Sequence, residues 1–119
     1  MTGIKKILVI NDESDTNMLM SIALKNKGYK IENAKGLGEG KAIFKELKPE
    51  LLFLDINLPD GNGLNHICYF KENLPLVKIC VISANDDIYK AYDYHADGIL
   101  IKPFSLAQII EKTKELIGE

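Results

Sequence analysis

Residues 51–55, Leu-Leu-Phe-Leu-Asp, form a continuous apolar run that ends in a carboxylate. Three further runs have the same character: residues 7–10 (Ile-Leu-Val-Ile), 79–82 (Ile-Cys-Val-Ile) and 99–101 (Ile-Leu-Ile). Short runs of this kind, rich in β-branched side chains, are typical of strands that a parallel sheet buries on both faces. We therefore predict four strongly apolar strands, and these decide the fold.

A weaker, more polar run at residues 30–34 predicts a fifth strand, and a stretch with helical periodicity follows each of the five strands. Strands that alternate with helices predict a doubly wound α/β fold, (βα)5, with a parallel sheet covered on both faces. Among open sheets of five such units we expect the strand order 2-1-3-4-5, which places the polar strand at an edge. One domain of this kind accounts for residues 1–119.

Capping residues and glycines predict where the helices begin and end. The first helix is expected to use Ser14 or Asp15 as its N-cap and to stop at Gly28. Ser105 is expected to cap the last helix. The apolar side chains expected along the first helix are Met18, Leu19, Ile22 and Ala23.

The composition excludes several classes of protein. The chain has 119 residues, 46% hydrophobic and 27% charged, which is ordinary for a soluble globular protein and rules out intrinsic disorder. All 15 basic residues are lysines, and 17 acids give a formal charge of −2, so we expect no direct nucleic-acid binding. No apolar run approaches the ~20 residues that span a bilayer, and we predict no membrane segment and no signal peptide. Cys68 and Cys80 suit a reducing compartment as two small buried hydrophobic residues, with a single disulfide as the alternative, and we expect a cytoplasmic protein.

Polar side chains gather where the predicted strands end. In an open α/β sheet, ligands bind outside the carboxyl ends of the strands, at the switch point between strands 1 and 3. Carboxylates that end buried strands there are costly to desolvate, and two of them repel each other, unless a cation offsets both effects. Mg²⁺ is the cation that favours one or two carboxylates together with water and phosphate oxygens. The residues expected at this edge are Asn11, Asp12, Asp55, Asn57, Ser83 and Lys102.

These residue types in this order suit phosphoryl transfer to Asp55 as the nucleophile. Ser83 and Lys102 would supply a hydroxyl and an ammonium to an anion bound beside the metal. Four segments carry a resemblance: residues 7–13, 54–63, 81–84 and 102–104. On these segments the sequence resembles a response-regulator receiver domain of two-component signalling over essentially its whole length. That resemblance implies the flavodoxin-like, CheY-like form of the predicted fold.

The resemblance also implies a chemistry for the edge. Asp55 would accept a phosphoryl group from a phosphohistidine on a sensor histidine kinase or a histidine phosphotransfer protein. Asp12 and Asp55 would hold Mg²⁺ through their carboxylates, and Asn57 through its backbone carbonyl. Ser83 and Lys102 would each bind a phosphoryl oxygen. Such a domain is not an enzyme acting on a separate substrate, because it catalyses only its own phosphorylation and dephosphorylation.

In this family the response to phosphorylation is read on another face. The resemblance assigns the switch and output role to Ser83, Ala84, Ile99 and Pro103, with a cis bond before Pro103. The surface of the fourth helix, fifth strand and fifth helix would contact a downstream protein or output domain, and it is a candidate homodimer surface. One or two of the residues Tyr89, Tyr92 and Tyr94 are expected at that interface.

Two positions depart from the family pattern. Asn11 stands where a second acid is usual; its amide oxygen could still reach the metal through a water, but we expect weaker Mg²⁺ binding. Ile99 stands where an aromatic switch residue is usual, which puts the familiar coupling in doubt. His95 replaces a common glycine, and we interpret it as structural because histidine tolerates the left-handed region.

Alternative interpretations remain. The departures motivate a degenerate receiver that binds a partner without phosphorylation. A haloacid-dehalogenase-like phosphatase also uses an aspartate nucleophile, but its Asp-x-Asp follows a first strand, whereas Asp55-Ile56-Asn57 follows the third. Gly36, Gly38 and Gly40 lack the spacing of a phosphate-binding loop and are interpreted as a flexible turn. His66 and His95 have no partners at metal-ligand spacing.

Overall fold

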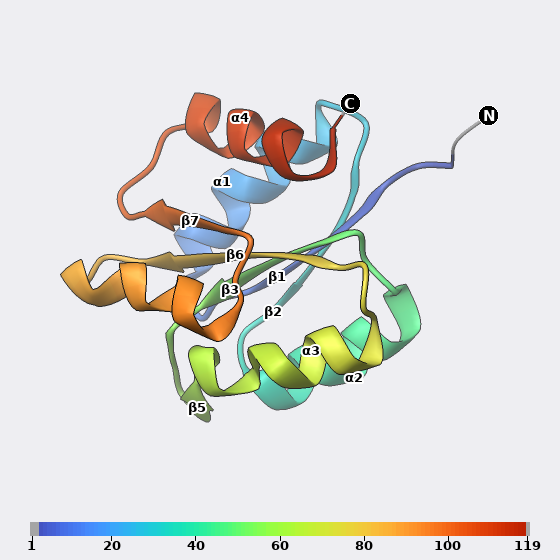
Figure 1. Cartoon of the computed structure of the whole chain (residues 1–119). Coiled ribbons are helices and arrows are strands. Elements are labelled where there is room, and N and C mark those ends of the chain that lie inside the picture. Colours follow the sequence, from blue (N-terminus) through green and yellow to red (C-terminus); the bar gives the residue numbers. More distant parts are fainter. Residues whose placement is uncertain (1–2, 119) are drawn as a thin grey trace.

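The computed structural model describes residues 3–118. Five parallel strands form its central sheet, in the order β2-β1-β3-β6-β7 (Figure 1). The strands are β1 (Lys6–Ile10), β2 (Lys30–Ala34), β3 (Leu51–Asp55), β6 (Lys78–Ser83) and β7 (Gly98–Ile101). This confirms the predicted strand order, with the polar strand β2 at one edge and β7 at the other.

The strand register brings the polar strand ends together. Ile10 pairs with Leu54, and Asp55 pairs with Ile82. Ser83 in turn pairs with Ile101, which directly precedes Lys102. The residues that follow β1, β3, β6 and β7 therefore meet at one edge of the sheet.

Helices cover both faces of the sheet, as predicted (Figure 1). One face carries α1 (Ser14–Lys25) and α4 (Leu106–Ile117). The other carries α2 (Leu37–Leu47) and α3 (Ile67–Asn73), and the 3-10 helix η1 (Gly63–His66) leads directly into α3. The fourth helical segment is a 3-10 helix, η2 (Asp86–Tyr94), whose buried residues Ile88 and Ala91 join the core on the α2–α3 side.

Alternation along the strands divides the core into two layers. Ile7, Val9 and Phe53 pack on the side of α1 and α4. Leu8 and Leu54 pack on the side of α2 and α3. All five are fully buried, as expected for strands covered on both faces.

The first helix differs from its prediction. It begins at Ser14, and its N-cap is Glu13 without a side-chain hydrogen bond, so capping by Ser14 or Asp15 is wrong. It ends at Lys25, and Gly28 lies three residues beyond with a φ of 90°. The expected apolar side chains are only partly on the core side: Met18 and Ile22 are 64% and 52% exposed, whereas Met20 and Leu24 are fully buried. The last helix follows its prediction, because Ser105 and Gln108 form a capping box.

The glycine-rich stretch is not a flexible turn. Gly38 and Gly40 lie inside α2, and Gly36 is its N-cap. A Cβ atom at Gly40 would collide with the side chain of Ile10 on β1. The absence of a side chain therefore lets α2 approach the sheet closely.

Three other expectations can be checked locally. His95 has a left-handed φ of 74° at the end of η2, as predicted. Cys80 is buried as expected, but the expectation for Cys68 is wrong, because Cys68 is exposed on α3; both are free thiols. Burial raises the pKa of Cys80 to about 12, which keeps this thiol protonated.

Among the helices of residues 3–118, none has the length and apolar character needed to cross a membrane.

Candidate functional site

Asp55 lies at the centre of the polar residues that meet at the carboxyl ends of the strands. It ends β3 with only 5% of its surface exposed. Its Oδ2 atom accepts a hydrogen bond from Lys102 Nζ at 2.9 Å, and its Oδ1 atom accepts one from the backbone N–H of Asn57 at 3.3 Å. The structure therefore holds this carboxylate in place from two sides.

Opposing effects act on the ionisation of Asp55. Burial raises the pKa of Asp55 above its ordinary value, and the nearby carboxylate of Asp12 raises it further. The Lys102 ammonium and the Asn57 amide lower the pKa, but not enough to offset the burial. The result is a carboxylate whose negative charge is under-compensated and therefore favours a cation.

Lys102 follows β7, and its backbone N–H donates to the Ser83 carbonyl at 2.9 Å. Its ammonium contacts three oxygen atoms: Glu13 Oε1 at 2.7 Å, Asp55 Oδ2 at 2.9 Å and Asn11 Oδ1 at 3.2 Å. Burial tends to lower the pKa of Lys102, but its bonds to Glu13 and Asp55 outweigh burial and leave the pKa raised. Lys102 therefore stays charged and at the site.

Glu13 was given no role by the sequence. Its contact with Lys102 lowers the pKa of the Glu13 carboxyl. Glu13 directly follows Asn11 and Asp12, and this run of three acidic or amide residues after β1 was the signal that could have identified it. Glu13 supplies a negative charge next to the position where Asn11 replaces an acid.

Asn11 lies fully buried in the same network. Its Nδ2 atom donates to Asn17 Oδ1 at 3.2 Å, and Asn17 Nδ2 donates to the Asn11 carbonyl at 2.8 Å. Asn17, a buried residue of α1, is a second residue that sequence reasoning missed; an amide among apolar positions of a helix was the available signal. The Asn11 side chain therefore connects α1 to Lys102.

The donor atoms at the edge fit a hard cation. Asp12 is exposed beside Asp55, close enough for its charge to affect the Asp55 carboxyl, and Asn57 follows Asp55 by two residues at the start of β4. Within residues 3–118, no three His, Cys, Asp or Glu side chains cluster as a metal site of their own. Two carboxylates and a carbonyl suit Mg²⁺, which keeps water and phosphate oxygens as its other ligands. The under-compensated charge of Asp55 is consistent with this assignment.

Ser83 ends β6 beside Asp55 and is almost fully buried. Its Oγ atom accepts a hydrogen bond from the backbone N–H of Asn85 at 3.1 Å. The hydroxyl proton is therefore not used in that bond and can donate elsewhere. The structure thus brings Ser83, Lys102 and Asp55 together at one edge, as the sequence predicted.

A hollow of about 410 Å³ opens beside this edge. Its wall includes Lys102 and Pro103, which are joined by a cis peptide bond, with Phe104 next to them. Thr16 and Leu19 of α1 form part of the other side.

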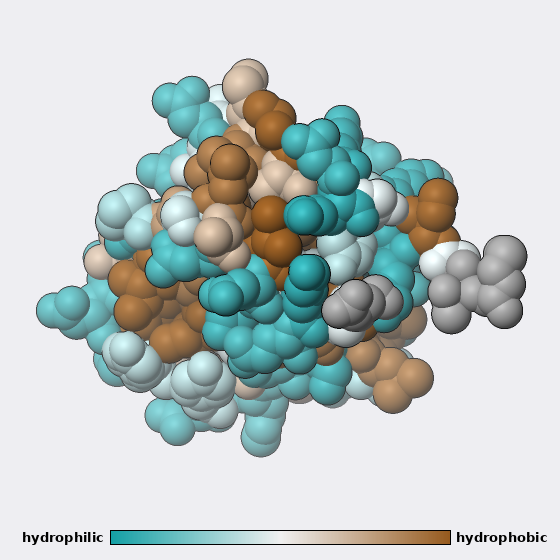
Figure 2. Space-filling model, turned by 90° about the horizontal axis from the view of Figure 1, so that it is seen from above, coloured by the Kyte–Doolittle hydropathy of each residue, from teal (hydrophilic) through white to brown (hydrophobic). Residues whose placement is uncertain are grey.

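Figure 2 looks down on the layer of α1 and α4, where hydrophobic side chains lie among hydrophilic ones. The exposed apolar residues of these two helices include Met18, Ile22 and Leu106.

The expected output residues do not lie in one place: Ala84 and Pro103 line the hollow beside Lys102, whereas Ile99 lies on β7. Ala84 is exposed directly after Ser83, while Ile99 is partly buried and packs against the core. Tyr89 and Ile99 line a shallow hollow of about 330 Å³ together with residues of α4. The three tyrosines of η2, Tyr89, Tyr92 and Tyr94, are 61%, 48% and 42% exposed.

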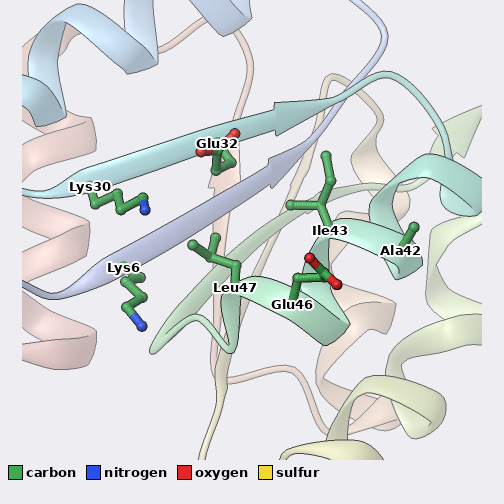
Figure 3. Close-up of a pocket in the computed structure, with 7 residues that line it drawn as sticks. All are labelled: Lys6, Lys30, Glu32, Ala42, Ile43, Glu46 and Leu47. Atoms are coloured by element: carbon green, nitrogen blue, oxygen red, sulfur yellow. The ribbon is translucent and has the colours of Figure 1, made fainter.

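A larger hollow, about 580 Å³, lies elsewhere, between α2 and the first two strands (Figure 3). Lys6 and Lys30 approach it from the strands, with Glu32 beside them, while Ile43, Glu46 and Leu47 approach from α2. Lys6 and Lys30 are the first residues of their strands. This hollow is therefore remote from the carboxyl ends of the strands and contains none of the predicted site residues.

Comparisons with known proteins bear on the family and the fold of this chain. The family model of the response regulator receiver domain matches residues 7–114. Among curated proteins, the chain is 30% identical over 121 residues to transcriptional regulatory protein PrrA of Mycobacterium leprae, covering 98% of this chain and 52% of PrrA. It is 30% identical over 105 residues to the KDP operon transcriptional regulatory protein KdpE of Escherichia coli, covering 87% of this chain and 47% of KdpE. The chain thus spans about half the length of these relatives.

Solved structures give the same result. The receiver domain of NtrX from Brucella abortus superimposes with a TM-score of 0.87 at 26% identity, covering 93% of this chain and 97% of that one. The beryllofluoride-activated NtrC4 receiver domain dimer gives a TM-score of 0.87 at 34% identity, covering 95% and 96%. Both similarities extend over nearly all of the fold described above.

Proposed function

The chain belongs to the response regulator receiver domain family, and from that premise we propose that Asp55 accepts a phosphoryl group in a Mg²⁺-dependent reaction. The observation that carries the proposal is the buried Asp55 carboxylate, held between Lys102 and the Asn57 amide, with its pKa raised by burial. The donor is a phosphohistidine of a sensor histidine kinase or histidine phosphotransfer protein. A carboxylate oxygen of Asp55 attacks phosphorus, a new O–P bond forms, and the P–N bond to the donor imidazole breaks.

Mg²⁺, when bound by Asp12, Asp55 and the Asn57 carbonyl, would neutralise charge on the carboxylates and the phosphoryl oxygens. Lys102 already lies 2.9 Å from Asp55, so its ammonium is placed to pair with an oxygen of a phosphoryl group attached there. The Ser83 hydroxyl can donate to another oxygen, since its present bond uses it only as an acceptor. Together these groups would stabilise the charge that spreads over the transferred group.

The surroundings suggest where partners would contact the domain. The hollow beside Lys102 is lined by Leu19 and Phe104 together with Glu13 and Asp15, and a partner that brings its phosphohistidine to Asp55 would contact this mixed surface. We assign the readout to Ser83, Ala84, Ile99 and Pro103, and to the surface formed by η2, β7 and α4. The exposed tyrosines of η2 suit contact with a downstream protein, an output domain or a second copy.

A phosphorylation-independent binding module is the other hypothesis for this fold, and nothing in the comparisons favours it. It was motivated by Asn11 and Ile99. The buried Asn11 amide is engaged by Lys102 and Asn17, a role that does not need a negative charge. The pair Asp12 and Asp55 is retained beside it.

Intact-protein mass spectrometry after incubation with acetyl phosphate tests the proposal. We expect a phosphoryl-sized mass increase that requires Mg²⁺ and is absent from Asp55→Asn. Asp12→Asn should lose most of the labelling at low Mg²⁺ concentration. A folded wild-type protein that gains no mass with Mg²⁺ would support the binding module instead.

A further inference from the structure

We infer that Asp60 is a positioning residue that holds the loop after β3, and with it Asn57, in the geometry required by the proposed Mg²⁺ site. This inference rests on the proposed function. Asp60 Oδ1 accepts a hydrogen bond from the backbone N–H of Leu37 at 2.8 Å, and its Oδ2 accepts one from Gly38 at 2.9 Å. An exposed side chain of the site loop thus binds the first turn of α2, more than twenty residues earlier in the chain.

A short hairpin connects Asp60 to the site. It consists of β4 (Asn57–Leu58) and β5 (Gly61–Asn62), with Asn57 paired to Asn62 and Leu58 paired to Gly61. Asp60 lies at the tip of this hairpin and Asn57 at its base. A two-stranded hairpin of this size is marginally stable by itself, so an anchor at its tip limits how its base can move.

The base of the hairpin contacts the phosphoacceptor directly. The Asn57 N–H donates to Asp55 Oδ1 at 3.3 Å, and the Asn57 carbonyl is the proposed third protein ligand of the metal. Movement of the hairpin would therefore displace both an Asp55 hydrogen bond and a metal ligand. Groups that orient metal ligands commonly control metal affinity although they do not touch the metal.

The approach of Asp60 depends on a residue without a side chain at position 36. A Cβ atom at Gly36 would lie 2.9 Å from Asp60 Oδ1 and 3.1 Å from Oδ2, inside van der Waals contact. Gly36 has a φ of −156°, which any residue can adopt, so the effect of a larger residue there is steric. A Cβ at Gly38 would lie 3.7 Å from Asp60 Oδ2, an ordinary contact. The two glycines therefore form a matched pair for testing the contact.

Charge supports the same contact. The two backbone amides lower the pKa of Asp60, so its carboxylate stays ionised over a wide pH range. A negative charge at the N-terminus of an 11-residue helix also interacts favourably with the helix dipole. The anchor at the hairpin tip is thus a charge-assisted contact rather than an incidental one.

The test measures Mg²⁺ binding by calorimetry at fixed pH and the Asn57 amide signal by NMR without metal. We expect Asp60→Ala to weaken Mg²⁺ binding about 10-fold, at the lower end of the ~10–100-fold typical of groups that orient metal ligands. Gly36→Ala should give a similar loss, because its methyl group pushes the carboxylate away. Gly38→Ala should bind Mg²⁺ like the wild type. Asp60→Asn keeps one oxygen acceptor and should recover part of the affinity.

Two results would overturn the inference. One is a folded Asp60→Ala protein that binds Mg²⁺ as tightly as the wild type. The other is an unchanged Asn57 amide signal in metal-free Asp60→Ala, since the loop would then not depend on this contact. If the wild-type protein binds no Mg²⁺, the proposed metal-dependent function fails, whereas the metal-free NMR comparison still decides whether Asp60 holds the loop.

Discussion

The ammonium of Lys102 lies 2.7 Å from the carboxylate of Glu13, nearer than the 2.9 Å that separates it from Asp55. Before any phosphoryl group arrives, Lys102 is therefore shared between two acids. Glu13 is more than half exposed, with 56% of its side-chain surface accessible, whereas the Asp55 side chain is 7% accessible. Release of Lys102 from the exposed partner is thus the easier of the two movements.

Replacement of Glu13 by Gln is expected to speed labelling of Asp55 by acetyl phosphate a few-fold. The variant frees Lys102 for the phosphoryl group and removes one negative charge that repels the donor. Because the pair is exposed on one side, its loss should change the free energy of unfolding by at most about 1 kcal/mol. Stopped labelling reactions followed by mass spectrometry measure the rate. Asp93→Asn, on the surface of η2, is the control, and a slower Glu13→Gln would show that Glu13 assists the reaction.

Asp55→Asn is expected to stabilise the protein at neutral pH, because asparagine avoids the cost of burying an ionised carboxylate. Burial raises the folded-state pKa of Asp55 above its ordinary 3.8. The folded state therefore binds more protons than the unfolded state just above pH 3.8, and this group's contribution to stability falls as the pH rises through that window. Above the raised pKa, the ionised carboxylate still lowers the free energy of unfolding, and asparagine removes this effect. Urea unfolding at pH 7 and near pH 4 measures the effect, and an equal change at both pH values would contradict the assigned cause.

Gly63→Ala is expected to destabilise the protein by about 3 kcal/mol or to prevent folding. Overpacking of a core typically costs about 1–3 kcal/mol, and the cost is highest where the added atom meets rigid backbone. A Cβ at this position would collide with the backbone carbonyl of Asp55, which cannot move without disturbing the site. Gly40→Ala should cost less, since its Cβ meets the end of the Ile10 side chain. Gly3→Ala should be nearly neutral, because nothing lies within 4 Å of its Cβ. Thermal unfolding of the three variants checks this order, and equal losses at positions 3 and 63 would refute it.

Ser83→Ala is expected to slow Asp55 labelling about 10- to 100-fold. Removal of one hydrogen-bond donor to a developing anion typically slows an enzyme by about 100-fold or more, so the expected loss is at or below that range. The Mg²⁺ affinity should stay unchanged, because Ser83 is not a proposed ligand. Ser83→Thr retains the hydroxyl and should keep most of the rate. Parallel rate and calorimetric measurements separate the two effects. Weaker Mg²⁺ binding by Ser83→Ala would instead indicate that the buried hydroxyl supports the site as a whole.

Much of the fold follows from local sequence. The buried strands are recognisable because both of their faces meet apolar layers, and the strand order brings Asp12, Asp55, Ser83 and Lys102 to one edge. The rotation of α1 about its axis does not follow in the same way. Met18 and Ile22 are apolar but exposed, whereas Asn17 is buried, since contact with the sheet and with Asn11 decides which stripe of the helix faces inward.

Two features of the site depend on contacts between distant segments. Asp60 binds the start of α2, and Lys102 binds Glu13 across 89 residues of sequence. Neither contact leaves a periodic or capping signal in its own segment. Gly36 and Gly40 were misinterpreted for the same reason, because what they approach, Asp60 and Ile10, is set by the packing of α2 on the sheet.

Asp55 itself is the residue proposed to carry the phosphoryl group. Borohydride reduction of protein treated with acetyl phosphate and Mg²⁺ converts an aspartyl phosphate to homoserine, which peptide mass spectrometry can locate. We expect homoserine at position 55 in the wild type, little without Mg²⁺, and none at that position in Asp55→Asn. Homoserine at another aspartate, or none in a folded and Mg²⁺-bound protein, would contradict it.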